Sequence, residues 1–249
     1  MPLALALMRA LEARGRRVLN GSRVFALELS KSTQAAVITS LGLSTPRTHT
    51  FNDPAALDAV AERIRFPALI KPDQGGSGAR IHEVQGLPAL RDLVASTPGI
   101  WEPDNLLNVQ ERIAADPARG IVRRELLDGQ LLYAMRVVSH GRYNLCPAPV
   151  CNPEDASAGA CDVPSAAPPV EFYPYPEVPA EAVEAGLRIA SAVGLDVGGI
   201  EYLDGLDGRR YFFDINANSN LRPSIAQAFG FDPFDRVAAF LKAQLARAS

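Results

Sequence analysis

Apolar positions along the chain follow helical spacing in some segments and strand-like alternation in others. Helical spacing predicts helices at about residues 3–14, 24–41, 54–65, 87–96, 180–193 and 233–247. Short apolar or alternating runs predict strands at about residues 17–21, 48–51, 66–71, 80–84, 106–113, 121–127, 131–139, 197–204 and 209–216. The chain is therefore expected to mix short helices with short strands, and we find no internal repeat.

Two turn dipeptides indicate how the later strands pair. Asp128-Gly129 separates strands 121–127 and 131–139, and Asp207-Gly208 separates strands 197–204 and 209–216. Such dipeptides are typical of tight β-hairpins. Neighbouring hairpins favour an α+β fold with largely antiparallel sheets over a doubly wound parallel sheet.

Residues 140–178 break this pattern, because they are dense in Pro, Ala and Gly. A loop of that length is uncommon in a compact domain and is usually functional or mobile. It contains His140, Cys146, Cys151 and Cys161. One His and three Cys can bind Zn²⁺, but their spacing matches no standard zinc motif, so three unrelated reduced thiols are the alternative.

Composition narrows the class of protein. The 249 residues are 47% apolar and 21% charged, with a net charge of −3, so bulk charge predicts neither a nucleic-acid nor a membrane partner. No apolar run is long enough to span a membrane, and the arginines near the N-terminus follow the apolar start instead of preceding it as in a secretory signal. An odd count of three cysteines argues against a disulfide framework. We expect a cytoplasmic protein.

A glycine-rich loop follows the apolar run that ends at Lys71. It contains Gly75, Gly76, Ser77 and Gly78, and a strand, not a helix, comes next. The loop is thus neither a P-loop nor a dinucleotide fingerprint. Backbone N–H groups of glycines can approach an anion closely, which favours a phosphate-binding flap. The alternative is a flexible hairpin beside a surface lysine.

An acid and an amide follow one another in the last predicted hairpin. Asp214 and Asn216 share one face of strand 209–216, and Glu201 in the partner strand falls roughly opposite Asp214. Two carboxylates and an amide oxygen suit Mg²⁺. A pair of solvated edge acids is the other interpretation.

These segments occur in an order that resembles the ATP-grasp superfamily, and most closely its ribosomal-protein glutamate ligase-like branch. The resemblance covers about residues 20–240 and is carried by SKSTQAAVITSLGLSTPRT, PALIKPDQGGSGARI, NVQERI and GGIEYLDGLDGRRYFFDIN. It implies two α+β subdomains that clamp ATP, and an ATP- and Mg²⁺-dependent ligase that joins a carboxylate to an amine or thiol through an acyl phosphate. The substrate would be a small molecule or a peptide.

The resemblance also implies roles for individual residues. Lys31, Lys71 and the loop residues Gly75, Gly76, Ser77 and Gly78 would contact the phosphates, as would Asn144. The segment Gln110, Glu111, Arg112 and Ile113 would hold the adenine, and Glu201, Asp214 and Asn216 would bind one or two Mg²⁺ ions. Arg123 matches a basic residue that the family places on the strand after residues 110–113. Beside the resemblance, Arg136, on the strand after the hairpin turn, is a candidate for contact with phosphate or acyl phosphate. Arg222 could hold a substrate carboxylate, or it could pair with an acid on a helix.

The implied domains are residues 1–22, the remnant of an N-terminal subdomain; 23–110, the glycine-flap subdomain; and 111–249, the metal-binding subdomain with its long loop at 140–178. Because that N-terminal subdomain is short, we expect a partner chain, a homodimer mate or the long loop to complete the acceptor site.

The metal segment departs from the usual Glu-x-Asn pattern of the family. It reads Asp214-Ile215-Asn216, and Glu201 stands where Asp is usual. The Asp-Ile-Asn form also resembles ATP-grasp inositol phosphate kinases. A kinase for a small hydroxyl substrate therefore stays an alternative, as does a nucleotide-binding subunit or pseudoenzyme that needs a partner.

Overall fold

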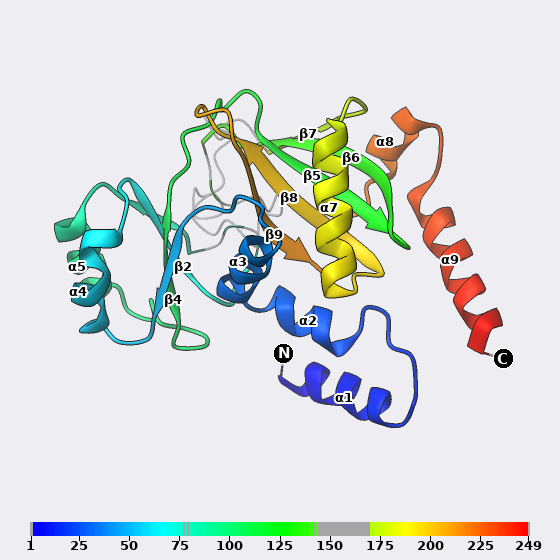
Figure 1. Cartoon of the computed structure of the whole chain (residues 1–249), viewed down its shortest axis with the longest axis horizontal. Coiled ribbons are helices and arrows are strands. Elements are labelled where there is room, and N and C mark those ends of the chain that lie inside the picture. The colour runs from blue at the N-terminus through cyan, green and yellow to red at the C-terminus, as the bar shows by residue number, and fades with distance from the viewer. Residues whose placement is uncertain (1, 77, 79, 142, 144–169, 249) are drawn as a thin grey trace, which may run out of the picture.

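Two antiparallel sheets organise the computed structural model, which describes residues 2–76, 78, 80–141, 143 and 170–248 (Figure 1). The smaller sheet has the order β1-β4-β2-β3 and the larger β7-β6-β5-β8-β9. The strands of the smaller sheet are β1 (Thr48–Phe51), β2 (Ala68–Pro72), β3 (His82–Val84) and β4 (Leu107–Glu111). Those of the larger sheet are β5 (Ile121–Leu127), β6 (Gln130–Val138), β7 (Glu171–Pro174), β8 (Val197–Asp204) and β9 (Arg210–Asn216). The predicted α+β class is confirmed.

Helices flank both sheets. They are α1 (Pro2–Ala13), α2 (Ser22–Glu28), α3 (Lys31–Ser40), α4 (Ala56–Val60), α5 (Leu87–Ser96), α7 (Ala180–Val193), α8 (Pro223–Ala226) and α9 (Pro233–Ala248), with 3-10 turns at Ala61–Arg63 and Gln227–Phe229. Figure 1 shows α4 and α5 beside the smaller sheet and α7 lying across the larger one. No helix of the described residues is long and apolar enough to cross a bilayer.

Helix α7 illustrates how the apolar pattern specifies an element. Its buried side is made by Ala182, Ala185, Ile189 and Val193, which recur at helical spacing. Gly194 ends the helix in the left-handed conformation with φ of 79°, which costs a glycine nothing. The predicted boundaries of this helix are confirmed.

The predicted hairpin turn at Asp128-Gly129 is also confirmed. Both residues have positive φ, 50° and 72°, and they connect Leu127 to its partner Gln130. Two successive positive φ angles match the right-handed twist of the strands that the turn joins.

The predicted helix over residues 24–41 is wrong as a single element. The chain breaks after Glu28, and Ser30 begins α3 by accepting a hydrogen bond from the Thr33 N–H. A serine that competes for backbone hydrogen bonds is favoured at such a start and disfavoured within a helix. The strand expected at residues 17–21 does not form, and β7 lies in the segment that was expected to be loop.

Each sheet has its own apolar core. The smaller sheet packs residues such as Ile70, Leu90 and Val109, whereas the larger packs against α7 and also receives Val24 and Ile38. Helices α2 and α3, which we assigned to the glycine-flap subdomain, therefore pack with the larger sheet. The domain boundaries themselves stay a prediction.

A buried arginine lies between α7 and the larger sheet. Arg124 donates a hydrogen bond to the carbonyl oxygen of Ala182, and its guanidinium carbon is 5.0 Å and 5.1 Å from the ring centres of Tyr202 and Phe212. A Cβ atom on Gly186 would collide with that guanidinium. Glycine therefore occupies this helical position because the arginine needs the space.

We predict that Gly186→Ala lowers the free energy of unfolding by about 1–3 kcal/mol, because the added methyl overpacks the site. This loss should appear although alanine is the better helix former by about 1 kcal/mol. Urea denaturation measures the change. Ser191→Ala, on the exposed side of the same helix, is the matched control, and equal stability of Gly186→Ala and wild type would contradict the prediction.

Candidate active site

Two adjoining cavities lie between the sheets. One, of about 170 Å³, is lined by Lys31, the glycine loop and Asn216; the other, of about 230 Å³, is lined by β4, the segment after it and parts of β6, β8 and β9. The cavities share Gly78, Val137, Glu201 and Asp214. Together they form one cleft. We call the first cavity, beside Lys31 and the glycine loop, the polar cavity, and the second, along β4, the apolar slot.

Lys71 lies on β2, where the sheet faces the cleft. Its Nζ donates to Gln110 Oε1 at 2.9 Å, and Gln110 donates in turn to Thr48 Oγ1 at 2.8 Å. Within the described residues, no carboxylate lies within 4.0 Å of Nζ. Burial lowers the pKa of Lys71 to about 8, although the more distant charge of Asp214 acts to raise it.

Lys31 begins α3 and reaches both sides of the polar cavity. Its Nζ is 3.5 Å from Asp214 Oδ1 and donates to the carbonyl oxygen of Gly75 at 3.1 Å. Asp73 holds this helix start against the end of β2, because its Oδ1 accepts from the Ser32 N–H at 2.7 Å and from Asn108 Nδ2 at 2.9 Å. The two lysines thus approach the cleft from different elements that one carboxylate ties together.

Asp214 occupies a bulge in β9. Ile200 pairs with Ile215 and Glu201 with Phe213, so Asp214 has no partner in β8 and adopts a φ of 47°. Aspartate tolerates this left-handed conformation better than most residues. We expected Asp214 roughly opposite Glu201; the bulge shifts that register, yet both side chains line the same cleft.

Arg123 on β5 fixes the other acid. It donates to Glu125 Oε1 at 2.6 Å, to Glu201 Oε1 at 2.9 Å and to the carbonyl oxygen of Asn218 at 3.1 Å. Burial raises the pKa of Glu201 well above its usual range; Arg123 opposes the rise and the charge of Asp214 adds to it. Burial also acts to raise the pKa of Asp214, but the lysines prevail and lower it.

Residues 110–113, the segment that the resemblance assigns to the adenine, border the apolar slot. Gln110, Glu111, Arg112 and Ile113 line it together with Ile81, Leu203 and Phe213. At its rim, Arg112 Nε is 3.1 Å from Glu83 Oε2 and donates to the Tyr143 hydroxyl at 3.2 Å. The slot therefore has apolar walls with charged groups at its mouth.

The two remaining arginines lie apart from this cluster. Val137 lines the cleft, so the side chain of the preceding residue, Arg136, lies on the opposite face of the sheet. There the guanidinium carbon of Arg136 is 5.8 Å from the ring centre of Tyr175. Arg222 stacks on Phe172 at 3.4 Å, and Phe172 lines the polar cavity. The structure thus places Arg222 behind the cavity wall and separates Arg136 from the cleft.

Several predicted ligands lie outside the described residues, namely Ser77, Asn144, Cys146, Cys151 and Cys161. The proposed zinc set therefore stays a prediction. His140 is described, and its Nε2 lies 2.6 Å from Glu171 Oε2. Among the described residues, no group of three or more His, Cys, Asp or Glu side chains could hold a metal ion.

Sequence reasoning overlooked three residues of the site. Gln34 lies one helical turn after Lys31, and its Oε1 accepts from the Ile215 N–H at 2.8 Å, a placement that helical spacing could have indicated. Asp73 comes two residues after Lys71 and could have been found by its position. Glu28 also lines the polar cavity, as does Phe172, which lies in the unpredicted strand β7.

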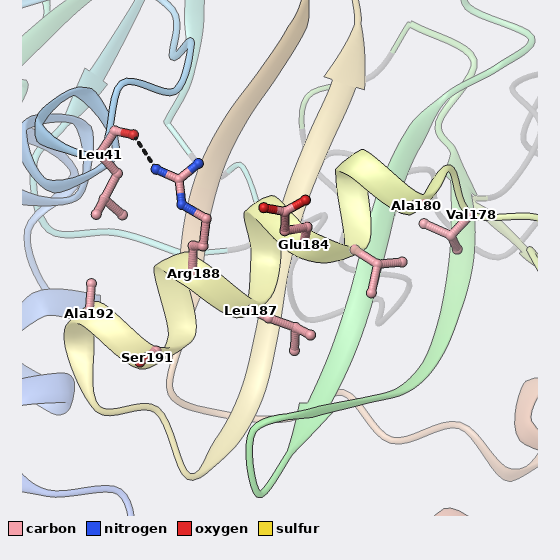
Figure 2. Close-up of a pocket in the computed structure, with 9 residues that line it drawn as sticks. Leu41, Val178, Ala180, Glu184, Leu187, Arg188, Ser191 and Ala192 are labelled. Atoms are coloured by element: carbon pink, nitrogen blue, oxygen red, sulfur yellow. Dashed lines mark hydrogen bonds between the residues drawn. The ribbon is translucent and has the colours of Figure 1, made fainter.

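A larger hollow of about 880 Å³ lies on the outer side of α7 (Figure 2). Leu187, Ser191 and Ala192 contribute to its lining, and Arg188 reaches across it to donate to the carbonyl oxygen of Leu41 at 2.7 Å. None of the lysines or acids of the cleft lines it. Its size does not make it a reaction site.

We predict that, with no ligand added, Lys71→Met raises the free energy of unfolding, and that the increase is largest at pH below 8. In wild type the folded state then carries a buried charge that the unfolded state solvates freely. Because the folded-state pKa is about 8 and the unfolded value about 10.5, this penalty fades as pH rises through that window.

Urea denaturation at pH 7, 8.5 and 10 should show the difference between variant and wild type shrinking with pH. Lys242→Met, on the exposed part of α9, is the control. A difference that does not change with pH would contradict the lowered pKa of Lys71.

Neither a protein-family model nor a curated protein matches the chain, but solved structures do. The ATP-grasp ligase PsnB complexed with its minimal precursor is 23% identical with a TM-score of 0.60, over 89% of this chain and 62% of that one. VanG D-Ala:D-Ser ligase from Enterococcus faecalis is 21% identical with a TM-score of 0.62, over 91% and 64%. D-alanine–D-alanine ligase from Bacillus anthracis is 16% identical with a TM-score of 0.68, over 96% and 74%.

PsnB has also been solved with a phosphomimetic precursor variant, Mg and ADP, at 22% identity and a TM-score of 0.64, over 98% of this chain and 68% of that one. In the matches to PsnB with its minimal precursor and to VanG, this chain covers 62% and 64% of the other chain, which is less than two thirds of its length. At identities this low, the structural similarity establishes the fold alone, and the particular branch within the superfamily stays a prediction. The chain has the ATP-grasp fold.

Proposed function

We propose that the protein is an ATP- and Mg²⁺-dependent ligase that joins a carboxylate to an amine through an acyl phosphate. The observation that carries this proposal is the meeting of two lysines and two acids, Lys31, Lys71, Glu201 and Asp214, in one cleft beside an apolar slot. Phosphoryl transfer depends on positioning and charge neutralisation, which such a set supplies.

In this proposal the nucleotide lies along the whole cleft. Its adenine would enter the apolar slot between Leu203 and Ile81 and meet the backbone of residues 111–113. Its phosphates would reach the polar cavity, where Lys31 and the glycine loop supply a cation and N–H donors. Lys71 borders the adjoining apolar slot and would approach the phosphates from that side. Ser77 and Asn144 belong to the same proposed contacts.

The acids of the cleft fit a magnesium ion. Glu201 and Asp214 are carboxylates that raise the cost of each other's charge, and a divalent cation would relieve that cost. Asn216 uses its Nδ2 to donate to the carbonyl oxygen of Asp214 at 2.9 Å, which leaves its Oδ1 for the metal. All three supply oxygen, the donor that Mg²⁺ prefers, and the bound ion would neutralise phosphate charge.

The reaction would run in two steps. An oxygen of the substrate carboxylate attacks the γ-phosphorus, the bond to ADP breaks, and an acyl phosphate forms. The acceptor nitrogen, once an ammonium proton has passed to water, attacks the acyl carbon and forms the C–N bond. The C–O bond breaks, and phosphate leaves with its electron pair and with one proton from the nitrogen. Arg123 would act by holding Glu201 in place, while Arg222 would bind a substrate carboxylate if Phe172 moved aside.

Peptides and amino acids are the substrate classes to test first. The similar structures are named for a precursor peptide in one case and for D-Ala and D-Ser in the others. Arg136 lies on the other face of the sheet and has no place in this scheme.

The test is to supply ATP, Mg²⁺ and pairs of acids and amines drawn from amino acids and peptides. We expect ADP and free phosphate in equal amounts only when both an acid and an amine are present. A phosphorylated product would establish the kinase alternative instead. Nucleotide binding without turnover on any pair would favour a subunit that needs a partner.

We predict that Asp214→Asn reduces turnover by at least about 100-fold, because it removes a metal-binding carboxylate but keeps its shape. The fold should persist, since asparagine also accepts a positive φ. Asp128→Asn is a matched control, because Asp128 has a similar φ of 50° in an exposed turn. Full turnover by the Asp214→Asn protein would refute the metal assignment.

A further inference from the structure

Glu28 is the acid of the polar cavity to which the proposed reaction has given no role. It is the last residue of α2 and is only partly exposed. It lines the cavity together with Lys31, Asn216 and Asn220, so it borders the same space as the proposed phosphate and metal contacts.

The carboxylate of Glu28 has an amide partner but no cationic one. Asn218 Nδ2 lies 3.1 Å from one carboxylate oxygen and 3.2 Å from the other. In the described part of the chain, no Lys, Arg or His nitrogen lies within 4.0 Å of it. A carboxylate offers about four acceptor positions, so this amide leaves acceptor capacity unused.

The other charges of the cavity are matched with one another. Lys31 faces Asp214 at 3.5 Å, and Arg123 lies 2.9 Å from Glu201. Glu28 thus carries a charge in a partly desolvated wall without an ion pair. Burial raises the pKa of Glu28. The side-chain amide of Asn218, the charge of Arg123 and the backbone N–H groups of Asn218 and Ala217 only partly oppose the rise. A cation placed beside the carboxylate would remove that cost.

We propose that Glu28 binds the ammonium group of the acceptor amine, an inference that rests on the proposed ligase function. A lysine side-chain amine has a pKa of about 10.4 and an α-amino group one of about 7.7–8.0, so at neutral pH both enter the cleft mainly as cations. The phosphates would occupy the lysines and the metal would occupy Glu201 and Asp214. Glu28 is the acid left to recognise a positive nitrogen, through a charge-assisted hydrogen bond.

This assignment explains how one cavity can hold both substrates in order. Lys31 in the polar cavity attracts anions, whereas Glu28, at the end of α2, attracts cations. An acceptor bound through its nitrogen at Glu28 would place that nitrogen in the same cavity as the acyl phosphate. A neutral hydroxyl group could donate a hydrogen bond to this carboxylate but would lack the attraction between opposite charges, so Glu28 also favours amines over alcohols.

The experiment measures amine binding by calorimetry to the full chain saturated with Mg²⁺ and AMPPNP. The probes are amino acid amides, which carry an ammonium group and no carboxylate, and their N-acetylated forms, which are neutral. We expect wild type to bind at least one amide and none of the acetylated forms. Glu28→Gln should weaken that amide by roughly tenfold or more, as the loss of a charge-assisted hydrogen bond implies, and leave AMPPNP affinity unchanged.

Glu184→Gln is the control, because Glu184 is exposed on α7 beside the outer hollow in Figure 2 and should bind the amide as wild type does. Glu28→Asp keeps the charge and should keep the preference for the amide, which serves if Glu28→Gln does not fold. Equal amide binding by Glu28→Gln and wild type would overturn the inference. So would AMPPNP binding without binding of any amide. Failure of AMPPNP to bind wild type would instead refute the proposed function.

Discussion

The pairing of Arg123 with Glu125 and Glu201 is the interaction on which the cleft depends. It places a guanidinium between two carboxylates inside the larger sheet, at 2.6 Å and 2.9 Å. Removing one member of such a buried group leaves an uncompensated charge and commonly costs about 3–5 kcal/mol. The sequence makes room for it with Gly199, where a Cβ atom would collide with the guanidinium. Glu201, which lines the cleft, is thus held in place by the buried guanidinium of Arg123.

Backbone geometry supplies the second constraint, because it brings groups from distant elements to the same point. Asp73 ties the start of α3 to the end of β2, which sets Lys31 and Lys71 on two sides of the cleft. The bulge in β9 then turns Asp214 toward Lys31 without displacing the rest of the strand. The hydrogen bonds of Asp73 and the bulge at Asp214 therefore bring side chains of two separate sheets to one site.

Local signals in the sequence were enough to predict most elements. The hairpin turn at Asp128-Gly129 and α7 followed from turn chemistry and periodicity. The same reasoning expected Glu201 and Asp214 to lie close together, and both line the cleft, although the bulge in β9 shifts the register that it assumed. The break between α2 and α3 was missed because apolar spacing continues through it, and β7 because strand pairing is decided by tertiary contact, not by its own residues. The sequence likewise could not tell which face of the sheet Arg136 occupies, because that depends on the register of β6.

The cleft is a poor environment for its own charges, and this connects stability with function. Burial lowers the pKa of Lys71 to about 8 and raises that of Glu201, so the charged form of each group costs more in the cleft than in water. These departures have opposite signs, and no single mobile ion corrects both. A polyphosphate bound with a divalent metal brings anionic oxygens to the lysine and a cation to the acid together. The cost of these two charges therefore matches the ligand that the fold is proposed to bind.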